Sequence, residues 1–208
     1  MFIEAIDKLR CIRQHEDSWL VAKFVEMRDR DFWDGELGCP VCEARYPVKQ
    51  GVAYFSPIRR SKARDVSPAQ TPGDLFALAA MLDLSAAERT VVLCDGWTAF
   101  AQGLSQISEP HIFTMNSTEP AGPAERIYSV ASDGAIPLAP ASVDAVALDI
   151  NSTPALIQSA VKTVREGGRI IGKSGVSLPD AVLLLANDEM NWVAQKRSDF
   201  IPLRRASR

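Results

Sequence analysis

Three cysteines and one histidine in the first 42 residues could together bind a metal ion. Cys39 and Cys42 are separated by two residues, the gap with which a tight turn presents two thiolates to one metal ion. Cys11 and His15 form a second pair with a three-residue gap. Zinc accepts sulfur and imidazole nitrogen in a tetrahedron, so these four residues predict a Cys3His zinc site. The alternative is a metal-free fold in which the cysteines are small buried apolar residues and His15 lies exposed on a turn.

The sequence around Cys39 and Cys42 resembles a known zinc-ribbon family. It contains Cys-Pro-Val-Cys, then Tyr-Pro-Val at positions 46–48, then Gly51-Val52. These elements are similar to the small zinc-ribbon activator subunit shared by several tRNA and translation-factor methyltransferases, and to its bacterial relatives. The resemblance covers about residues 8–56 and implies a bound zinc ion and a ribbon that binds and stabilises a methyltransferase partner. The Cys11-x3-His15 pair departs from the family, which has a CxxC there.

The second half of the chain alternates apolar, β-rich runs with stretches that have helical spacing. Predicted strands, in chain order, are Thr90–Cys94, His111–Met115, Ile127–Val130, Val143–Asp149 and Arg169–Gly172, followed by an edge hairpin of Trp192–Lys196 and Phe200–Arg204. Predicted helices begin at Thr71-Pro72 and Ala99, run from Pro154 to a stop at Gly167-Gly168, and run from Pro179 to about Asn187. This alternation predicts an α/β fold: a mostly parallel, Rossmann-like sheet with helices on both faces.

In such a sheet the ligand lies outside the carboxyl ends of the strands, so the turns that follow the strands matter most. After the first predicted strand come Asp95, Gly96 and Trp97. This turn is similar to the first motif of class I S-adenosylmethionine (SAM)-dependent methyltransferases, in which three glycines at alternate positions follow an acidic residue. Only Gly96 remains here, because Thr98 and Phe100 occupy the other two positions. A side chain at those positions fills the space that a closely bound cofactor needs.

Two later positions complete the predicted cofactor site. The resemblance to methyltransferases covers about residues 72–205. It places Asn116 where the family has a carboxylate that holds the ribose hydroxyls, and Asp133 where the family contacts the adenine amine. Asn116 can make one such contact without the charge that strengthens it. The resemblance thus implies a SAM-binding fold in which scaffold motifs are kept and ligand contacts are depleted.

Two functions follow from these residues, and the sequence leaves both open. One is a pseudo-enzyme, a methyltransferase-like domain whose cleft is plugged by Trp97 and Phe100 and which acts as a partner-binding or scaffold module. The other is an active SAM-dependent methyltransferase that acts on RNA, protein or a small molecule. Trp97 at the cleft mouth could stack on a ring or fill an empty pocket. Asp149 could act as a base or, with its neighbours Asn151 and Ser152, cap the helix that begins near Pro154.

Composition limits the classes of protein that this chain can belong to. With 47% apolar and 24% charged residues it has an ordinary globular composition, and no apolar run approaches the roughly 20 residues that span a bilayer. The amino terminus lacks the order of a secretory signal, which predicts a cytoplasmic location. We expect a zinc-ribbon-like domain at 1–57, a linker at 58–71 and a methyltransferase-like domain at 72–208.

Partners are predicted mainly from the ribbon, which we expect to contact another protein. Nucleic acid is a weaker alternative, because the net charge is −3 although basic residues cluster in the linker and at the carboxyl end. These clusters are Arg59, Arg60, Lys62, Arg64, Lys196, Arg197, Arg204, Arg205 and Arg208. Cys94 lies inside a predicted strand and is expected to be a core residue rather than a nucleophile.

Overall fold

The structure is a computed structural model that describes residues 1–56, 71–86, 88–117 and 126–198. The predicted linker, apart from Thr71, lies outside the described residues, as do its basic cluster, Phe200–Arg204 and the arginines that follow Lys196 and Arg197. The division into domains at these positions stays a prediction. No helix in the described part of the chain is long and apolar enough to cross a membrane.

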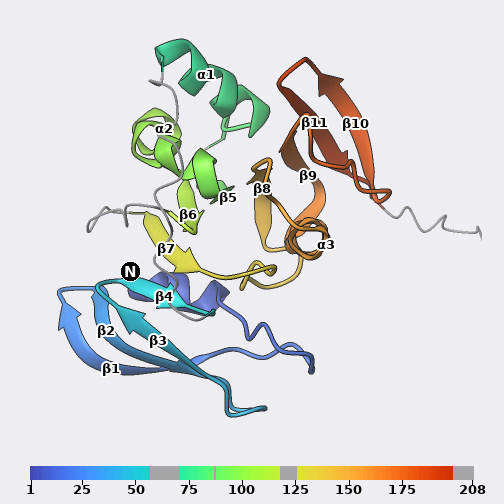
Figure 1. Ribbon diagram of the computed structural model, residues 1–208. Helices are drawn as coiled ribbons and strands as arrows, with labels where there is room; N and C mark the ends of the chain where they lie inside the picture. The colour runs from blue at the N-terminus through green and yellow to red at the C-terminus, as the bar shows by residue number, and fades with distance from the viewer. Residues whose placement is uncertain (57–70, 87, 118–125, 199–208) are drawn as a thin grey trace, which may run out of the picture.

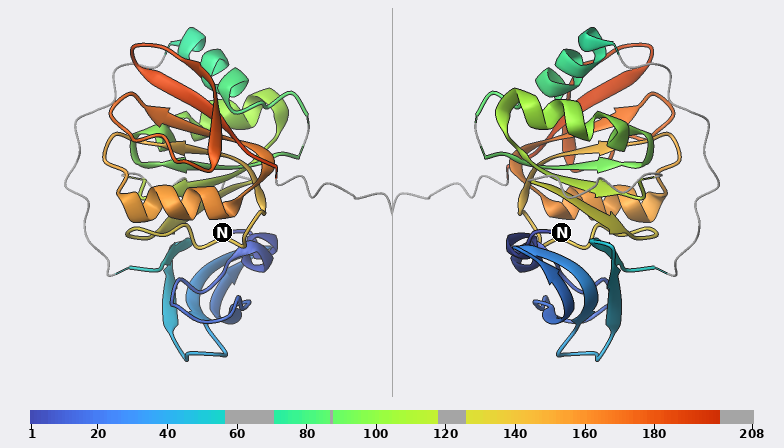
Figure 2. Two further views of the ribbon diagram at one scale, coloured as in Figure 1. Left: turned by 90° about the vertical axis from the view of Figure 1, so that its right-hand side faces the viewer. Right: turned by 90° about the vertical axis from the view of Figure 1, so that its left-hand side faces the viewer.

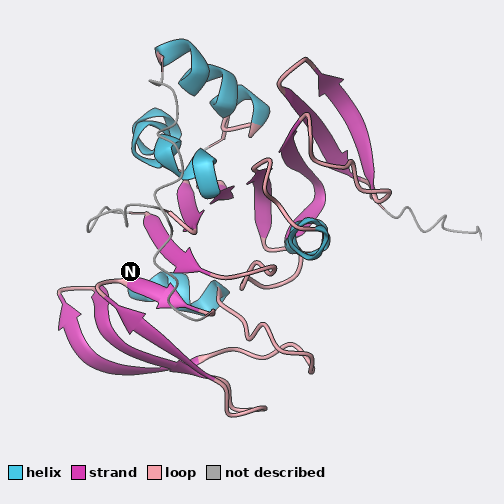
Figure 3. Cartoon of the chain, viewed as in Figure 1, coloured by secondary structure: helices cyan, strands magenta, loops and turns pink. Residues whose placement is uncertain are grey.

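The amino-terminal part is built mainly from strands (Figure 3). Its elements are η1, a short 3-10 helix (Ile3–Lys8), β1 (Val21–Arg28), β2 (Asp31–Gly38), β3 (Arg45–Lys49) and β4 (Val52–Tyr54). Consecutive strands pair antiparallel, so β1 to β4 form a meander. Between η1 and β1 the chain is irregular, and it contains Cys11 and His15 there.

The remaining elements combine helices with a larger set of strands. They are α1 (Pro72–Met81), β5 (Thr90–Cys94), η2 (Asp95–Phe100), α2 (Ala101–Ser108), β6 (His111–Met115), β7 (Ile127–Ala131), β8 (Val143–Leu148), α3 (Pro154–Thr163), β9 (Val164–Lys173), β10 (Val182–Asn187) and β11 (Asn191–Lys196). Thr71 begins α1 with a reciprocal capping box to Asp74, as its position before Pro72 predicts.

All of these strands belong to one 11-stranded sheet with the order β1-β2-β3-β4-β7-β6-β5-β8-β9-β11-β10. Strands β7, β6, β5, β8 and β9 are parallel, and the hairpin β10–β11 adds to β9 antiparallel. The expected mostly parallel sheet is therefore a mixed one. From β5 the chain moves first to β6 on one side and later to β8 on the other, so the strand order reverses between β5 and β8. In open α/β sheets the ligand cleft lies at that point.

Strand β4 joins the amino-terminal meander to the rest of the sheet. It pairs parallel with β7, with Val52 opposite Ser129 and Tyr54 opposite Ala131. Two backbone hydrogen bonds extend the junction beyond the strands, from Arg10 N to Pro137 O at 2.9 Å and from Ala139 N to Lys8 O at 3.1 Å. Figures 1 and 2 show the blue meander below the remaining elements, continuous with them through β4. The meander thus covers an edge of β7 that would otherwise be free.

Helices cover both faces of the second part, as the alternation predicted. On one face, Leu78 of α1 and Leu104 of α2 pack with Leu93 and Ala147. On the other face, Leu156 of α3 packs in the cluster that contains alternate strand residues such as Val92 and Val146. That second cluster continues into the meander, where it includes Cys39, Ala44, Tyr46, Val48 and Phe55. The two parts of the chain therefore share one core.

Two predicted elements at the carboxyl end are wrong. The stretch Pro179–Asn187 was expected to be a helix but contains the strand β10, which pairs with β11 from Val182 to Asn187. Helix α3 ends at Thr163, before Gly167-Gly168, and both glycines lie inside β9. A Cβ on Gly168 would lie 2.7 Å from the carbonyl oxygen of Asp144, so this glycine permits close approach of β8 and β9 and does not stop a helix.

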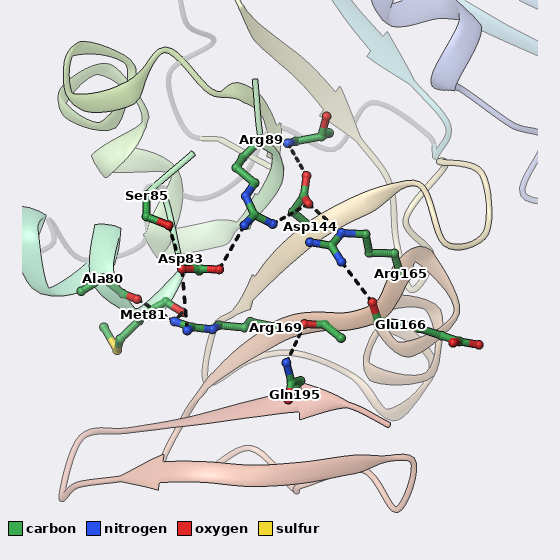
Figure 4. A network of polar contacts seen from close by, with 12 residues as sticks. Ala80, Met81, Asp83, Ser85, Arg89, Asp144, Arg165, Glu166, Arg169 and Gln195 are labelled. Atoms are coloured by element: carbon green, nitrogen blue, oxygen red, sulfur yellow. Dashed lines mark hydrogen bonds and ion pairs between the residues drawn. The ribbon is translucent and has the colours of Figure 1, made fainter. Parts of the chain in front are cut away.

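Asp144 on β8 is the centre of a polar network at the end of the sheet opposite the cleft (Figure 4). Its carboxylate accepts hydrogen bonds from Thr90 N at 2.9 Å, Arg89 Nη1 at 2.9 Å and Arg165 Nε at 2.7 Å. Burial alone would raise the pKa of Asp144, but these three donors outweigh it and lower that pKa. The network links β5, β8 and β9.

Asp144→Asn is expected to lower the free energy of unfolding by about 2–3 kcal/mol, because a half-buried carboxylate with three donors is replaced by an amide that can accept fewer. The folded-state pKa is depressed, so this contribution is present above the unfolded-state pKa of about 3.9 and is lost as pH falls through the folded-state pKa. Urea unfolding at neutral pH and near pH 3 measures both effects. The exposed Asp180→Asn is the matched control, and an equal loss at both pH values would contradict the assignment.

Candidate functional site

The structure brings Cys11, His15, Cys39 and Cys42 together. Their ligand atoms all lie within 4.8 Å of one another. Cys11 Sγ is 3.6 Å from Cys42 Sγ, and Cys39 Sγ is 3.4 Å from His15 Nε2. A tetrahedron with metal–sulfur bonds of about 2.3 Å has edges of about 3.8 Å, so the two distances fit a shared metal ion. The four cysteines of the described chain are free thiols.

The hydrogen bonds around the cluster suit metal binding. His15 Nδ1 lies 2.5 Å from the carbonyl oxygen of Glu16, so Nδ1 can carry the proton and leave Nε2 for a metal. Burial alone raises the pKa of Cys39, but the backbone N–H groups of Cys42 and Val41 and the neighbouring thiols outweigh it and lower that pKa to about 7. A thiol that ionises this readily is a good metal ligand. The residues present therefore fit a zinc ion.

Two different kinds of local structure position the four ligands. Cys39 and Cys42 lie on the turn between β2 and β3, which is closed by hydrogen bonds from Cys39 N to Ala44 O at 2.8 Å and from Glu43 N to Cys39 O at 3.0 Å. Glu43 has a φ of 56°, which completes the tight turn. Cys11 and His15, by contrast, lie on the irregular segment before β1, without a comparable turn.

At the cleft, the turn after β5 is held closed by Asp149. The Gly96 N–H donates to Asp149 Oδ2 at 3.2 Å, and the Ile150 N–H donates to Asp149 Oδ1 at 2.8 Å. Asp95, which has a φ of 48°, begins the 3-10 helix η2 directly at the strand end. A Cβ on Gly96 would lie 3.2 Å from the Asp149 carboxylate. The backbone of this turn therefore faces a side chain of its own chain.

Trp97 is buried, with 5% of its surface exposed, and belongs to the core on the side of α1 and α2. Its Nε1 donates to the Leu148 carbonyl at 3.0 Å, its ring lies 5.9 Å from that of Phe100, and Lys173 Nζ lies 4.0 Å from its centroid. The indole thus packs between β5, β8 and β9 as a core side chain. It does not stand at an open mouth, as a stacking role would need.

Asn116 lies directly after β6 and uses both groups of its amide within the chain. Its Nδ2 donates to Ser132 O at 3.0 Å, and its Oδ1 accepts from Ser132 N at 3.0 Å. The backbone N–H of Asn116 also donates to Val130 O at 3.0 Å. The side chain therefore continues the pairing of β6 with β7 past the strand end, which opposes its use as a ribose ligand.

Asp133 follows β7, and its side chain is exposed. Its backbone N–H donates to Ser56 Oγ at 2.5 Å, which ties this loop to the end of the meander. Among the residues predicted to hold SAM, Asp133 keeps an exposed side chain at the carboxyl end of a strand.

Sequence reasoning missed three contacts at or near the cleft: the cap of α3 and the contacts that Asp149 and Lys173 make. Capping of α3 by Asp149, Asn151 and Ser152 was one alternative from the sequence, but the cap is Thr153, which accepts from Leu156 N at 3.2 Å. A threonine immediately before Pro154 is the signal that could have identified this cap. The contacts of Asp149 with Gly96 and of Lys173 with Trp97 join strands far apart in sequence, so no local signal could reveal them. Cys94 is buried in the core as predicted, and burial raises its pKa.

No family model and no curated protein match this chain. Solved structures do match. A putative SAM-dependent methyltransferase from Methanococcus maripaludis is 13% identical over 61% of this chain and 86% of its own, with a TM-score of 0.47. The antibiotic-resistance methyltransferase Kmr is 13% identical over 64% and 96%, with a TM-score of 0.40. A putative sarcosine dimethylglycine methyltransferase from Galdieria sulphuraria is 18% identical over 48% and 44%, with a TM-score of 0.40.

By their names, all three are methyltransferases. The chain spans less than half of the length of the Galdieria protein, and these are similarities of fold alone. The Cys/His cluster and the cleft contacts of this chain are the observations that bear on its function.

Proposed function

We propose that this protein is a metal-stabilised, methyltransferase-like scaffold that does not transfer methyl groups. The carrying observation is that Asn116, which stands where a methyltransferase holds the ribose, has both ends of its amide hydrogen-bonded to the backbone of Ser132. A ribose contact would require breaking this pair of hydrogen bonds and leaving the backbone N–H and carbonyl of the buried Ser132 without these partners, at a cost of about 1–3 kcal/mol each.

The turn after β5 supports the same proposal. A cofactor that approaches Gly96 closely would compete with Asp149 for the Gly96 N–H. The positions expected for two further glycines carry Thr98 and Phe100, and Thr98 Oγ1 donates to Asp95 O at 2.6 Å within η2. A short 3-10 helix thus occupies the place where a bare backbone loop would bind the ligand.

The amino-terminal part supplies the metal-stabilised element of the scaffold. We propose that Cys11, His15, Cys39 and Cys42 hold a zinc ion, which would fix β2 and β3 relative to the irregular segment before β1. Strand β4 of the amino-terminal part pairs with β7, so the amino-terminal part binds the second half of its own chain. A protein partner beyond this chain would bind surfaces other than the β4 edge, which is paired with β7.

Calorimetric titration with SAM and with its demethylated product tests the cleft. We expect no saturable heat up to millimolar ligand, because three of the five predicted cofactor positions, Gly96, Trp97 and Asn116, are engaged within the chain. Metal analysis of the purified chain should find about one zinc per molecule.

Saturable micromolar binding would contradict the scaffold and favour the active methyltransferase. In that case Asp133→Ala should weaken binding, since Asp133 is the exposed carboxylate of the predicted site, whereas Asp180→Ala should not. A methyl-transfer assay with bound SAM would then separate binding from catalysis.

A further inference from the structure

Tyr46 on β3 reaches the metal cluster with its hydroxyl. Its Oη lies 3.0 Å from Cys11 Sγ, and the two residues are 35 positions apart. Only 5% of the tyrosine surface is exposed, and its ring packs 4.6 Å from the ring of Phe55. The ring is therefore held by the shared core while the hydroxyl points at one ligand atom.

The two halves of the cluster differ in how they are supported. Cys39 and Cys42 are fixed by the backbone hydrogen bonds of one tight turn. Cys11 lies on the segment without regular structure, where the backbone N–H of Arg13 is its local hydrogen-bond donor, and the Tyr46 hydroxyl is a further contact that comes from the core. A phenol hydroxyl carries its proton at neutral pH and donates well to a thiolate.

We propose that Tyr46 is the positioning residue for Cys11 in the metal site. Its hydroxyl holds Cys11 Sγ in the ligand geometry and takes part of the thiolate charge. This contact from a distant strand adds to the local hydrogen bond from the Arg13 N–H. The inference rests on the proposed zinc site and adds a residue that is not itself a ligand.

The Tyr46→Phe variant of the 208-residue chain tests the hydroxyl alone, because the ring and its packing remain. We expect its zinc affinity, measured by competition with a chromophoric chelator, to fall about 10- to 100-fold, the usual effect of removing a residue that orients a metal ligand. In the cobalt-substituted protein, the absorption bands of the thiolate ligands should shift. Tyr54→Phe, which removes a hydroxyl from the adjacent strand β4, is the matched control and should bind zinc like the original chain.

Phe55→Leu separates the hydroxyl from its packing, because it loosens the ring of Tyr46 but keeps the hydroxyl. We expect its cobalt spectrum to be unchanged and its zinc affinity to stay within a few-fold of the original. An affinity loss equal to that of Tyr46→Phe would overturn the proposal in favour of packing. Unchanged affinity and spectrum in Tyr46→Phe would also overturn it, while leaving the metal site intact.

Nuclear magnetic resonance of the cadmium-loaded original chain needs no variant. We expect one slowly exchanging tyrosine hydroxyl proton that is coupled to the metal through the Cys11 sulfur. Its absence from a loaded protein would refute the hydrogen bond. If the original chain fails to bind zinc, cobalt or cadmium, both the metal site and the role of Tyr46 are overturned. If it binds metal but Tyr46→Phe has no effect, only the role of Tyr46 is overturned.

Discussion

Replacing Cys39 with serine is expected to destabilise the whole chain and not only its amino-terminal part. Cys39 is one of the four proposed ligands, and 3% of its surface is exposed. Structural zinc sites contribute apparent free energies of about 10–16 kcal/mol at neutral pH, so the loss of one thiolate should lower the free energy of unfolding by about 5 kcal/mol or more. Domains are stable by only about 5–15 kcal/mol, so much of the protein would unfold.

The shared sheet and core predict how far this loss spreads. Strand β4 pairs with β7, and the cluster around Tyr46 and Phe55 is continuous with Phe113 and Val130. Hydrogen exchange measured by mass spectrometry should therefore show faster exchange in β3 and β4, and also in β7. A high-affinity chelator added to the original chain should have the same effect as the substitution.

Cys94→Ala is the matched control for Cys39→Ser. Cys94 is equally buried but lies in β5, outside the cluster. Its replacement should cost about 1–2 kcal/mol and leave the zinc content unchanged. A Cys39→Ser chain with normal stability and exchange would show that the cluster is a metal-free group of small core residues.

Strands with a strong local signal were predicted to the residue. Thr90–Cys94 and His111–Met115 are short, apolar and β-rich, and both lie in the middle of the sheet with helices or the meander on each face. Burial on both faces requires such uniform apolar runs, so the pattern and the structure agree. Helix α1 was equally clear, because Thr71 and Pro72 mark its start.

Strand β10 shows why other elements could not be predicted. Residues 181–186 are Ala-Val-Leu-Leu-Leu-Ala, which favour a helix by composition. They form an edge strand because β11 offers a hydrogen-bonding partner, and Leu183, Leu184 and Leu185 remain largely exposed. Pairing with the next segment of the chain in a hairpin, and of that hairpin with β9, thus overrides the helical preference of the residues themselves.

The same limit applies to the site. The four metal-ligand candidates were recognisable from their residue types, and the structure brings them together. The role of each cleft residue could not be recognised in this way, because that role depends on a hydrogen-bond partner distant in sequence. Asn116 pairs with Ser132, Gly96 with Asp149, and Tyr46 with Cys11. Spacing along the chain identifies residues that could bind a ligand. The folded structure shows which of them are already hydrogen-bonded within the chain.

Trp97→Ala is expected to lower the free energy of unfolding by about 3–5 kcal/mol, as for other buried aromatic residues. The indole fills the core beside Phe100, and its N–H satisfies the Leu148 carbonyl. We expect no SAM binding in this variant, because Asn116 and Gly96 remain hydrogen-bonded within the chain. A cleft plugged by Trp97 was one of two alternatives that the sequence left open, and the buried position of Trp97 argues for a collapsed or unfolded core in this variant.

Two further variants make the Trp97 prediction specific. Trp97→Phe keeps an aromatic ring but leaves the Leu148 carbonyl without its donor, so it should cost about 1–3 kcal/mol. Trp19→Ala removes an indole that is 68% exposed and should change stability by less than about 1 kcal/mol. Urea unfolding followed by circular dichroism orders the three variants, and calorimetry with SAM tests each folded one. A stable Trp97→Ala chain that binds SAM would contradict this prediction and show that the tryptophan closes a working cofactor site.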